Sequence, residues 1–162
     1  MNEEKLIQRD RMRFVKNSLS SNLCYLGILF NVFYFVLLYQ SDVGTYYYTI
    51  QIGASIVYNL LFLLVVFLAS EGVKNYQKVY SYILIAAGAM QVVRVFVIPA
   101  AAHAATIIVD GAEVAVMQNT QYTLSLIYLL LSAVCLVLSA LANIAKCSAL
   151  EAHNKYLESQ NA

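Results

Sequence analysis

The chain has 162 residues, of which 61% are hydrophobic and 12% charged, and its formal net charge at pH 7 is +1. Soluble domains are about half apolar and about a quarter charged, so this composition excludes an ordinary soluble domain. The N-terminal basic residues are interspersed with acidic ones and the net charge is small, which argues against nucleic-acid binding.

Apolar residues are concentrated in four blocks, each long enough to cross a hydrocarbon core about 30 Å thick at about 1.5 Å per residue. The blocks are residues 19–39, 46–70, 79–99 and 122–145, and only the third contains a charged residue, Arg94. The sequence therefore predicts an all-α integral membrane protein, folded as a four-helix transmembrane bundle with up-down-up-down topology. The expected organisation is a cytoplasmic basic segment over 1–18, the transmembrane domain over 19–145 and a cytoplasmic helical tail over 146–162.

The basic residues outside the spans all fall on one side of the predicted membrane. They are Lys5, Arg9, Arg11, Arg13, Lys16, Lys74, Lys78, Lys146 and Lys155. The positive-inside rule makes that side cytoplasmic. Both termini are therefore expected in the cytoplasm, with the protein in a plasma membrane of the bacterial inner-membrane type.

The outer connection between the third and fourth spans covers residues 100–121. Its Ala-rich start after Pro99 favours a helix that continues with a kink. Asp110-Gly111 between two β-branched runs instead indicates a small extracellular hairpin, and the sequence leaves the choice between helix and hairpin open. Asp110 and Glu113 are the acidic residues near the outer end of the third span, so they are candidate counter-charges for Arg94 or parts of a lid over it.

Polar residues recur at helical spacing inside the spans. In the fourth span, Ser125, Tyr128, Ser132, Cys135, Ser139 and Asn143 follow one another at steps of three or four and share one face. Such a stripe is typical of helices that pack closely and form hydrogen bonds across their interface. Tyr25, Tyr34, Tyr58 and Tyr128 also lie within spans, where each hydroxyl needs a hydrogen-bond partner or a wet cavity.

The depth of these polar residues predicts a pocket below the outer surface. With alternating span directions, the polar groups of all four helices gather near one level in the outer half of the membrane. The candidate ligand-binding residues are Asn31, Gln51, Ser55, Asn59, Gln91, Arg94, Tyr128 and Ser132. The alternative is that the same residues only hold the helices together.

The sequence is consistent with three interpretations of Arg94. Arg94 extends to the outer headgroups or pairs with Asp110 or Glu113. It is a buried structural donor to Asn31, to Gln51, to backbone carbonyls or to an oligomeric partner. Or it binds a ligand, because a planar guanidinium suits a carboxylate or a phosphate. No span contains Asp or Glu, which favours an anionic partner from outside the spans.

Motifs for common chemistry are absent from the sequence. The spans contain no carboxylate or His for proton coupling, and the chain has no zinc-protease, hydrolase, dithiol or P-loop motif. We therefore expect no catalytic residues, metal or cofactor, and a non-enzymatic accessory or ligand-binding subunit of a membrane complex. The alternatives are an oligomeric facilitative transporter or channel and, third, an intramembrane enzyme using His103. The expected partners are the lipid bilayer, an anionic lipid or small anion, and another membrane protein or a second copy.

Overall fold

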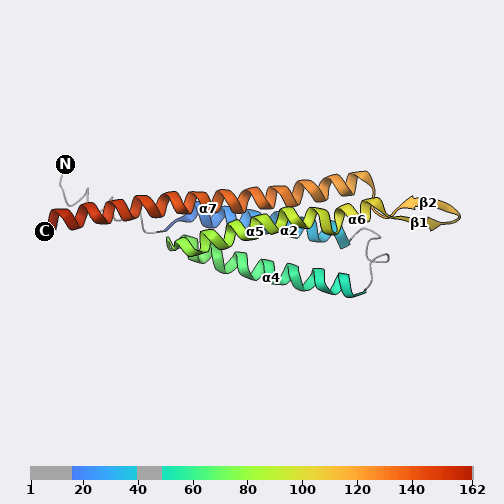
Figure 1. The fold of residues 1–162 in the computed structure, drawn as a ribbon, viewed down its shortest axis with the longest axis horizontal. Helices are drawn as coiled ribbons and strands as arrows, with labels where there is room; N and C mark the ends of the chain where they lie inside the picture. The colour runs from blue at the N-terminus through green and yellow to red at the C-terminus, as the bar shows by residue number, and fades with distance from the viewer. Residues whose placement is uncertain (1–15, 40–48, 162) are drawn as a thin grey trace.

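The computed structural model describes residues 16–39 and 49–161, and these residues are mostly helical (Figure 1). Four of the helices are long and apolar enough to cross a membrane, as the composition predicts. They are α2 (Ser18–Tyr39), α4 (Thr49–Lys74), α5 (Lys78–Val97) and α7 (Asn119–Asn161). The predicted N-terminal segment lies almost wholly outside the described residues, whereas α7 continues as one helix through the predicted tail.

Pro99 divides the third span into two helices. A proline has no backbone N–H and its ring clashes with the preceding turn, so it cannot continue α5 in register but can begin a new helix. The short helix α6 (Pro99–Ala104) begins there, directly after Ile98. The interruption expected at Pro99 is therefore present, and it sets the direction in which the outer connection leaves the bundle.

The rest of the outer connection is a hairpin, which resolves the choice that the sequence leaves open. Strands β1 (Thr106–Val109) and β2 (Ala112–Ala115) pair antiparallel. Asp110 and Gly111 between them have φ values of 52° and 81°, the two positive values that a type I′ turn requires. Figure 1 shows this hairpin projecting beyond the ends of the helices.

Helix α7 is the centre of the bundle. Both α2 and α5 pack along α7, while α4 packs on α2 and α5 (Figure 1). Two glycines permit the close approach to α7. A Cβ at Gly27 of α2 would lie 3.0 Å from Leu136, and a Cβ at Gly88 of α5 would lie 3.1 Å from Val137. Because glycine has no side chain, the helix backbones approach closely at these two positions. Close approach of this kind gives membrane helices packing contacts in the absence of a hydrophobic driving force.

A polar layer separates two apolar clusters in the interior. One cluster surrounds Leu136 and the other surrounds Leu129, and Ser132 lies between them on α7. Asn31 on α2 and Gln91 on α5 occupy the same intermediate position on their helices. The outward-facing Leu, Val and Phe side chains remain exposed, as expected for surfaces that contact lipid.

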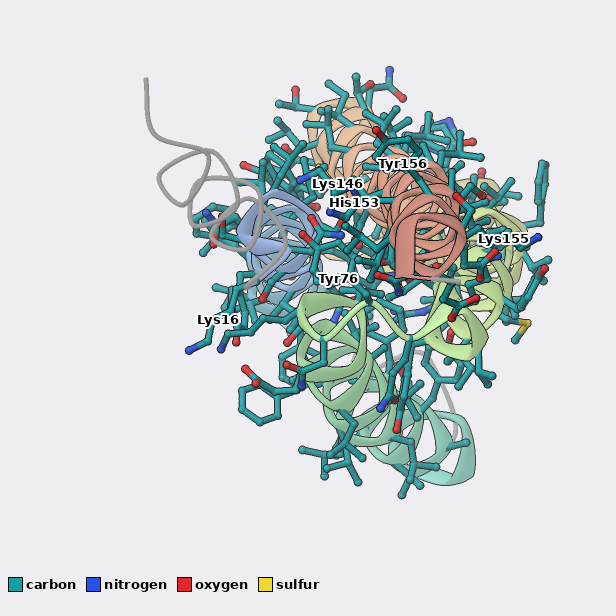
Figure 2. The ribbon with its side chains drawn as sticks, turned by 90° about the vertical axis from the view of Figure 1, so that its left-hand side faces the viewer. Lys16, Tyr76, Lys146, His153, Lys155 and Tyr156 are labelled. Atoms are coloured by element: carbon teal, nitrogen blue, oxygen red, sulfur yellow. The ribbon has the colours of Figure 1, made fainter. Side chains whose placement is uncertain are left out.

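A second polar network closes the opposite end of the bundle. Asn17 Nδ2 donates to Asn143 Oδ1 at 3.0 Å, and Asn143 Nδ2 donates to Ser81 Oγ at 2.9 Å, so α2, α5 and α7 are bonded together. Figure 2 views this end and shows Lys146 on α7. The Lys146 ammonium donates to Asn17 Oδ1 at 2.9 Å. The amide groups of this network are bonded to one another, so we interpret it as structural.

Candidate functional site

Arg94 is buried near the end of α5, with only 8% of its surface exposed. Its Nη1 donates to Asn31 Oδ1 at 2.8 Å and to Gln91 Oε1 at 2.9 Å, and its Nη2 donates to Asn59 Oδ1 at 2.9 Å. A guanidinium has five N–H groups, so these bonds use three of them. Side chains from α2, α4 and α5 therefore hold the cation in one orientation.

Two tyrosine rings flank the guanidinium. The Arg94 Cζ atom lies 4.8 Å from the Tyr34 ring centroid and 4.6 Å from the Tyr58 ring centroid. A cation over an aromatic face is stabilised by about 2 kcal/mol when the pair is desolvated. These rings replace part of the hydration that Arg94 loses, but neither ring cancels its positive charge.

A second set of hydrogen bonds fixes the amides that hold Arg94. Gln91 Nε2 donates to Asn31 Oδ1 at 3.0 Å and to Ser132 Oγ at 3.1 Å. Ser132 Oγ in turn donates to the backbone carbonyl of Gly27 at 2.8 Å. Asn59 Nδ2 donates to the Ser55 carbonyl at 3.0 Å. The network thus connects all four long helices, and the carboxamide oxygens are turned toward Arg94 because their NH₂ groups are used elsewhere.

No acidic side chain contacts Arg94 among residues 16–39 and 49–161. The ion pairs found there are Lys74–Glu71 at 3.0 Å and Lys78–Glu151 at 2.6 Å, both near the opposite end of the bundle. Asp110 is in the hairpin turn. That carboxylate and the exposed Glu113 make no bond to the guanidinium in the described structure. Arg94 therefore keeps an uncompensated positive charge within the described structure.

Arg94 also forms part of the wall of a cavity of about 370 Å³ between α4 and α5. Ser55 is in the same wall. Its Oγ is buried and has no hydrogen-bond partner among the described residues. The other lining residues are Tyr34, Ala54, Tyr58, Met90, Val93, Val97 and Ile98. The cavity therefore presents a cation and a hydroxyl on an otherwise largely apolar wall.

The structure brings most of the sequence-predicted site residues together. Asn31, Asn59, Gln91, Ser132 and Arg94 form the bonded network, and Ser55 lies at the cavity.

Tyr128 stands apart from this network, and Gln51 cannot be placed in it or outside it. Tyr128 instead packs against Phe33, with ring centroids 5.7 Å apart. Gln51 belongs to α4, but its side chain lies outside the described residues.

Two site residues are missing from the sequence-based set. Tyr34 and Tyr58 flank the guanidinium, although their positions inside the spans indicate only that each needs a polar surrounding. Helical spacing indicates both, because Tyr34 is three residues after Asn31 and Tyr58 is three residues after Ser55. Residues three apart on a helix share a face, so Tyr34 belongs with Asn31.

Metal-ligating side chains do not cluster in the described part of the chain. No group of three or more His, Cys, Asp or Glu residues is found there. Cys24, Cys135 and Cys147 are each buried and form no disulfide with one another.

The chain was compared with known proteins by sequence and by structure. No protein-family model, no curated protein and no solved structure matches it.

Proposed function

We propose that the chain is a non-enzymatic membrane protein that binds an anion at Arg94, as a ligand-binding or accessory subunit of a membrane complex. One observation carries the proposal: a buried arginine with no acidic partner among the described residues lines a cavity beside an unpartnered serine. Removing one partner of a buried ion pair costs about 3–5 kcal/mol because a charge is left uncompensated. An anion entering the cavity supplies the missing charge.

The proposal includes an up-down-up-down arrangement in a plasma membrane of the bacterial inner-membrane type, with both termini in the cytoplasm. Bonded pairs support opposite directions for α2 and α7, since Asn17 meets Asn143 while Gly27 meets Ser132. Lysines from different elements also gather at one end, where Figure 2 shows Lys16 beside α2 and Lys146 and Lys155 on α7. This clustering supports a cytoplasmic location for that end, and Arg94 then lies toward the outer leaflet.

The described contacts give less support to the transporter or channel alternative. That alternative uses the polar stripe of α7 as the lining of a path between copies. Ser132 of the stripe donates to the Gly27 carbonyl, and Ser139 donates to the Ser20 carbonyl at 2.7 Å. These hydroxyls donate within one chain, which supports a structural role for this part of the stripe.

The intramembrane-enzyme alternative has no supporting geometry in the described residues. His103 stacks on Tyr122 with ring centroids 4.4 Å apart, and it makes no hydrogen bond to a serine of α7 there.

Native mass spectrometry of the protein released from mild detergent tests the proposal. The wild type should retain an anionic adduct, a lipid or a small anion, that Arg94→Gln loses. Lys155→Gln removes the same charge from an exposed site on α7 and should keep the adduct. Equal adducts on the wild type and Arg94→Gln would contradict the proposal. The same spectra report co-purifying subunits and the number of copies.

Arg94→Gln leaves the amides of the network without their cation, so its folding must be checked by circular dichroism. Arg94→Lys is the second variant because it keeps a positive charge but has three donors in place of a planar fork. It should remain folded and retain the adduct more weakly than the wild type.

A further inference from the structure

The cavity at Arg94 has two chemically different sides. Arg94 and Ser55 supply polar hydrogen atoms on one side, and Met90, Val93 and Val97 supply an apolar side. A small inorganic anion is best held by donors all around it, as water holds it. An anion attached to an apolar chain instead matches both sides at once.

The residues that line the cavity lie within candidate membrane spans. Every lining residue belongs to a candidate membrane span, from Tyr34 in Ser18–Leu38 to Ile98 in Lys78–Ala104. Met90, Val93 and Val97 recur at helical spacing on α5 and remain substantially exposed, with Val93 exposed by 51%. The edge of the cavity thus has exposed apolar side chains of α5 at the level of the candidate spans, where a chain leaving between α4 and α5 would meet hydrocarbon and not water.

The volume limits how much of a ligand is enclosed. A cavity of about 370 Å³ holds roughly twelve groups of the size of a water molecule, at about 30 Å³ each. That is enough for a carboxylate or phosphate headgroup and the first few carbons of one chain. A second chain would have to share the remaining space, so the volume favours a ligand with one chain.

The donors left at the polar side suit a headgroup with one negative charge. Three of the five guanidinium N–H groups donate to amide oxygens and Tyr34 contacts the group as well, so at least one N–H remains for a ligand. Ser55 is 8% exposed, and its hydroxyl, which has no partner among the described residues, supplies another donor. A guanidinium N–H and a hydroxyl can donate to the two oxygens of one carboxylate or phosphate in charge-assisted hydrogen bonds.

We infer that the ligand is a single-chain anionic amphiphile, whose carboxylate or phosphate headgroup binds Arg94 and Ser55 while its chain passes between α4 and α5 into the bilayer. This inference rests on the proposed function, because it specifies the class of the anion. It predicts that neither a free anion nor an uncharged chain binds well alone, since each matches one side of the cavity.

The test measures saturable binding of radiolabelled dodecanoate to the full chain in phosphatidylcholine nanodiscs. Unlabelled dodecanoate, dodecyl phosphate, dodecanol, inorganic phosphate and phosphatidylglycerol compete in separate experiments. Dodecanoate and dodecyl phosphate should compete, and the one effective at lower concentration identifies the preferred headgroup. Dodecanol, inorganic phosphate and phosphatidylglycerol should compete at least about tenfold less well.

A matched pair of variants tests the path of the chain. Val93→Trp fills the cavity mouth without touching the hydrogen-bond network, and it should weaken dodecanoate binding by at least about tenfold. Val92→Trp is the control, because Val92 is also exposed on α5, by 41%, but does not line the cavity. It should bind as the wild type does. Equal binding by both variants would overturn the lateral path.

The outcomes separate this inference from the proposed function. If inorganic phosphate competes as well as dodecanoate, and both lose binding in Arg94→Gln, the anion site stands and the amphiphile is wrong. If phosphatidylglycerol competes equally, the single-chain limit is wrong. If no anion shows binding that depends on Arg94, both the inference and the proposed function are overturned.

Discussion

Asn31→Asp places a negative charge beside Arg94 without changing the shape of the side chain. Asn31 Oδ1 accepts hydrogen bonds from Arg94 Nη1 at 2.8 Å and from Gln91 Nε2 at 3.0 Å, and a carboxylate accepts both. The bond lost is the long one from Asn31 Nδ2 to Asn59 Oδ1, at 3.4 Å. The variant thus supplies from within the chain the negative charge that we assign to the ligand.

The expected magnitude follows from these distances. Unit charges about 4 Å apart attract by roughly 4 kcal/mol at an effective dielectric constant of about 20. Removing the carboxylate from water costs several kcal/mol, so the two terms nearly cancel and the fold should be retained. A ligand anion about 5 Å from the new carboxylate is repelled by roughly 3 kcal/mol. Since 1.4 kcal/mol is tenfold in affinity, dodecanoate binding should weaken by about a hundredfold.

The assay combines SDS-induced unfolding followed by circular dichroism with dodecanoate binding in nanodiscs. Asn31→Asp should unfold within about 2 kcal/mol of the wild type and lose most binding. Asn154→Asp makes the same change at an exposed position on α7 and should change neither quantity. A folded Asn31→Asp protein that binds dodecanoate as tightly as the wild type refutes an anion site at Arg94.

Three further substitutions test particular contacts. Ser55→Ala removes a buried hydroxyl that lacks a partner among the described residues. The free energy of unfolding should therefore be unchanged or higher by up to about 1 kcal/mol, while dodecanoate binding weakens. A lower free energy of unfolding would show that the hydroxyl is already bonded. Gly72→Ala places a Cβ against the Tyr80 ring and should lower the free energy of unfolding in SDS by about 1–3 kcal/mol. Adding Tyr80→Leu should restore part of that loss. An unchanged unfolding midpoint in Gly72→Ala would contradict this packing. Asn143→Leu removes three N–H···O hydrogen bonds worth about 0.6 kcal/mol each and a weaker one from the Cys147 thiol, or about 2 kcal/mol in total. Asn154→Leu on the exposed tail should stay within about 0.5 kcal/mol, and equal effects of the two substitutions would contradict a structural role for the network.

Helical periodicity and depth explain why much of this arrangement could be predicted. A helix rises about 1.5 Å per residue, so the level of each polar residue in a span follows from its distance to the span ends. This rise alone places Asn31, Gln91 and Ser132 near the level of Arg94. The steps of three and four in α7 likewise predict its protein-facing side, and Ser125, Ser132 and Ser139 are buried there.

The remaining details depend on the rotation of each helix about its axis and on the direction of the outer connection. The rotation of α4 brings Asn59 against the guanidinium and places the Tyr58 ring over it. Periodicity defines a face of α4 but not which neighbour that face meets, so this partner could not be chosen from the sequence. Similarly, the new helix at Pro99 carries Asp110 and Glu113 into a hairpin beyond the helix ends (Figure 1). The sequence alone does not fix that direction.

The contact between the anion and Arg94 can be measured directly by solid-state NMR. The protein would carry ¹⁵N in its arginine guanidinium groups and bind dodecanoate labelled with ¹³C at its carboxyl carbon, in phosphatidylcholine bilayers. A directly hydrogen-bonded pair predicts a carbon-to-nitrogen distance of about 4 Å, and the corresponding dipolar coupling should disappear in Arg94→Gln. Dodecanoate that binds saturably without this coupling, or with a coupling that persists in Arg94→Gln, would contradict an anion site at Arg94.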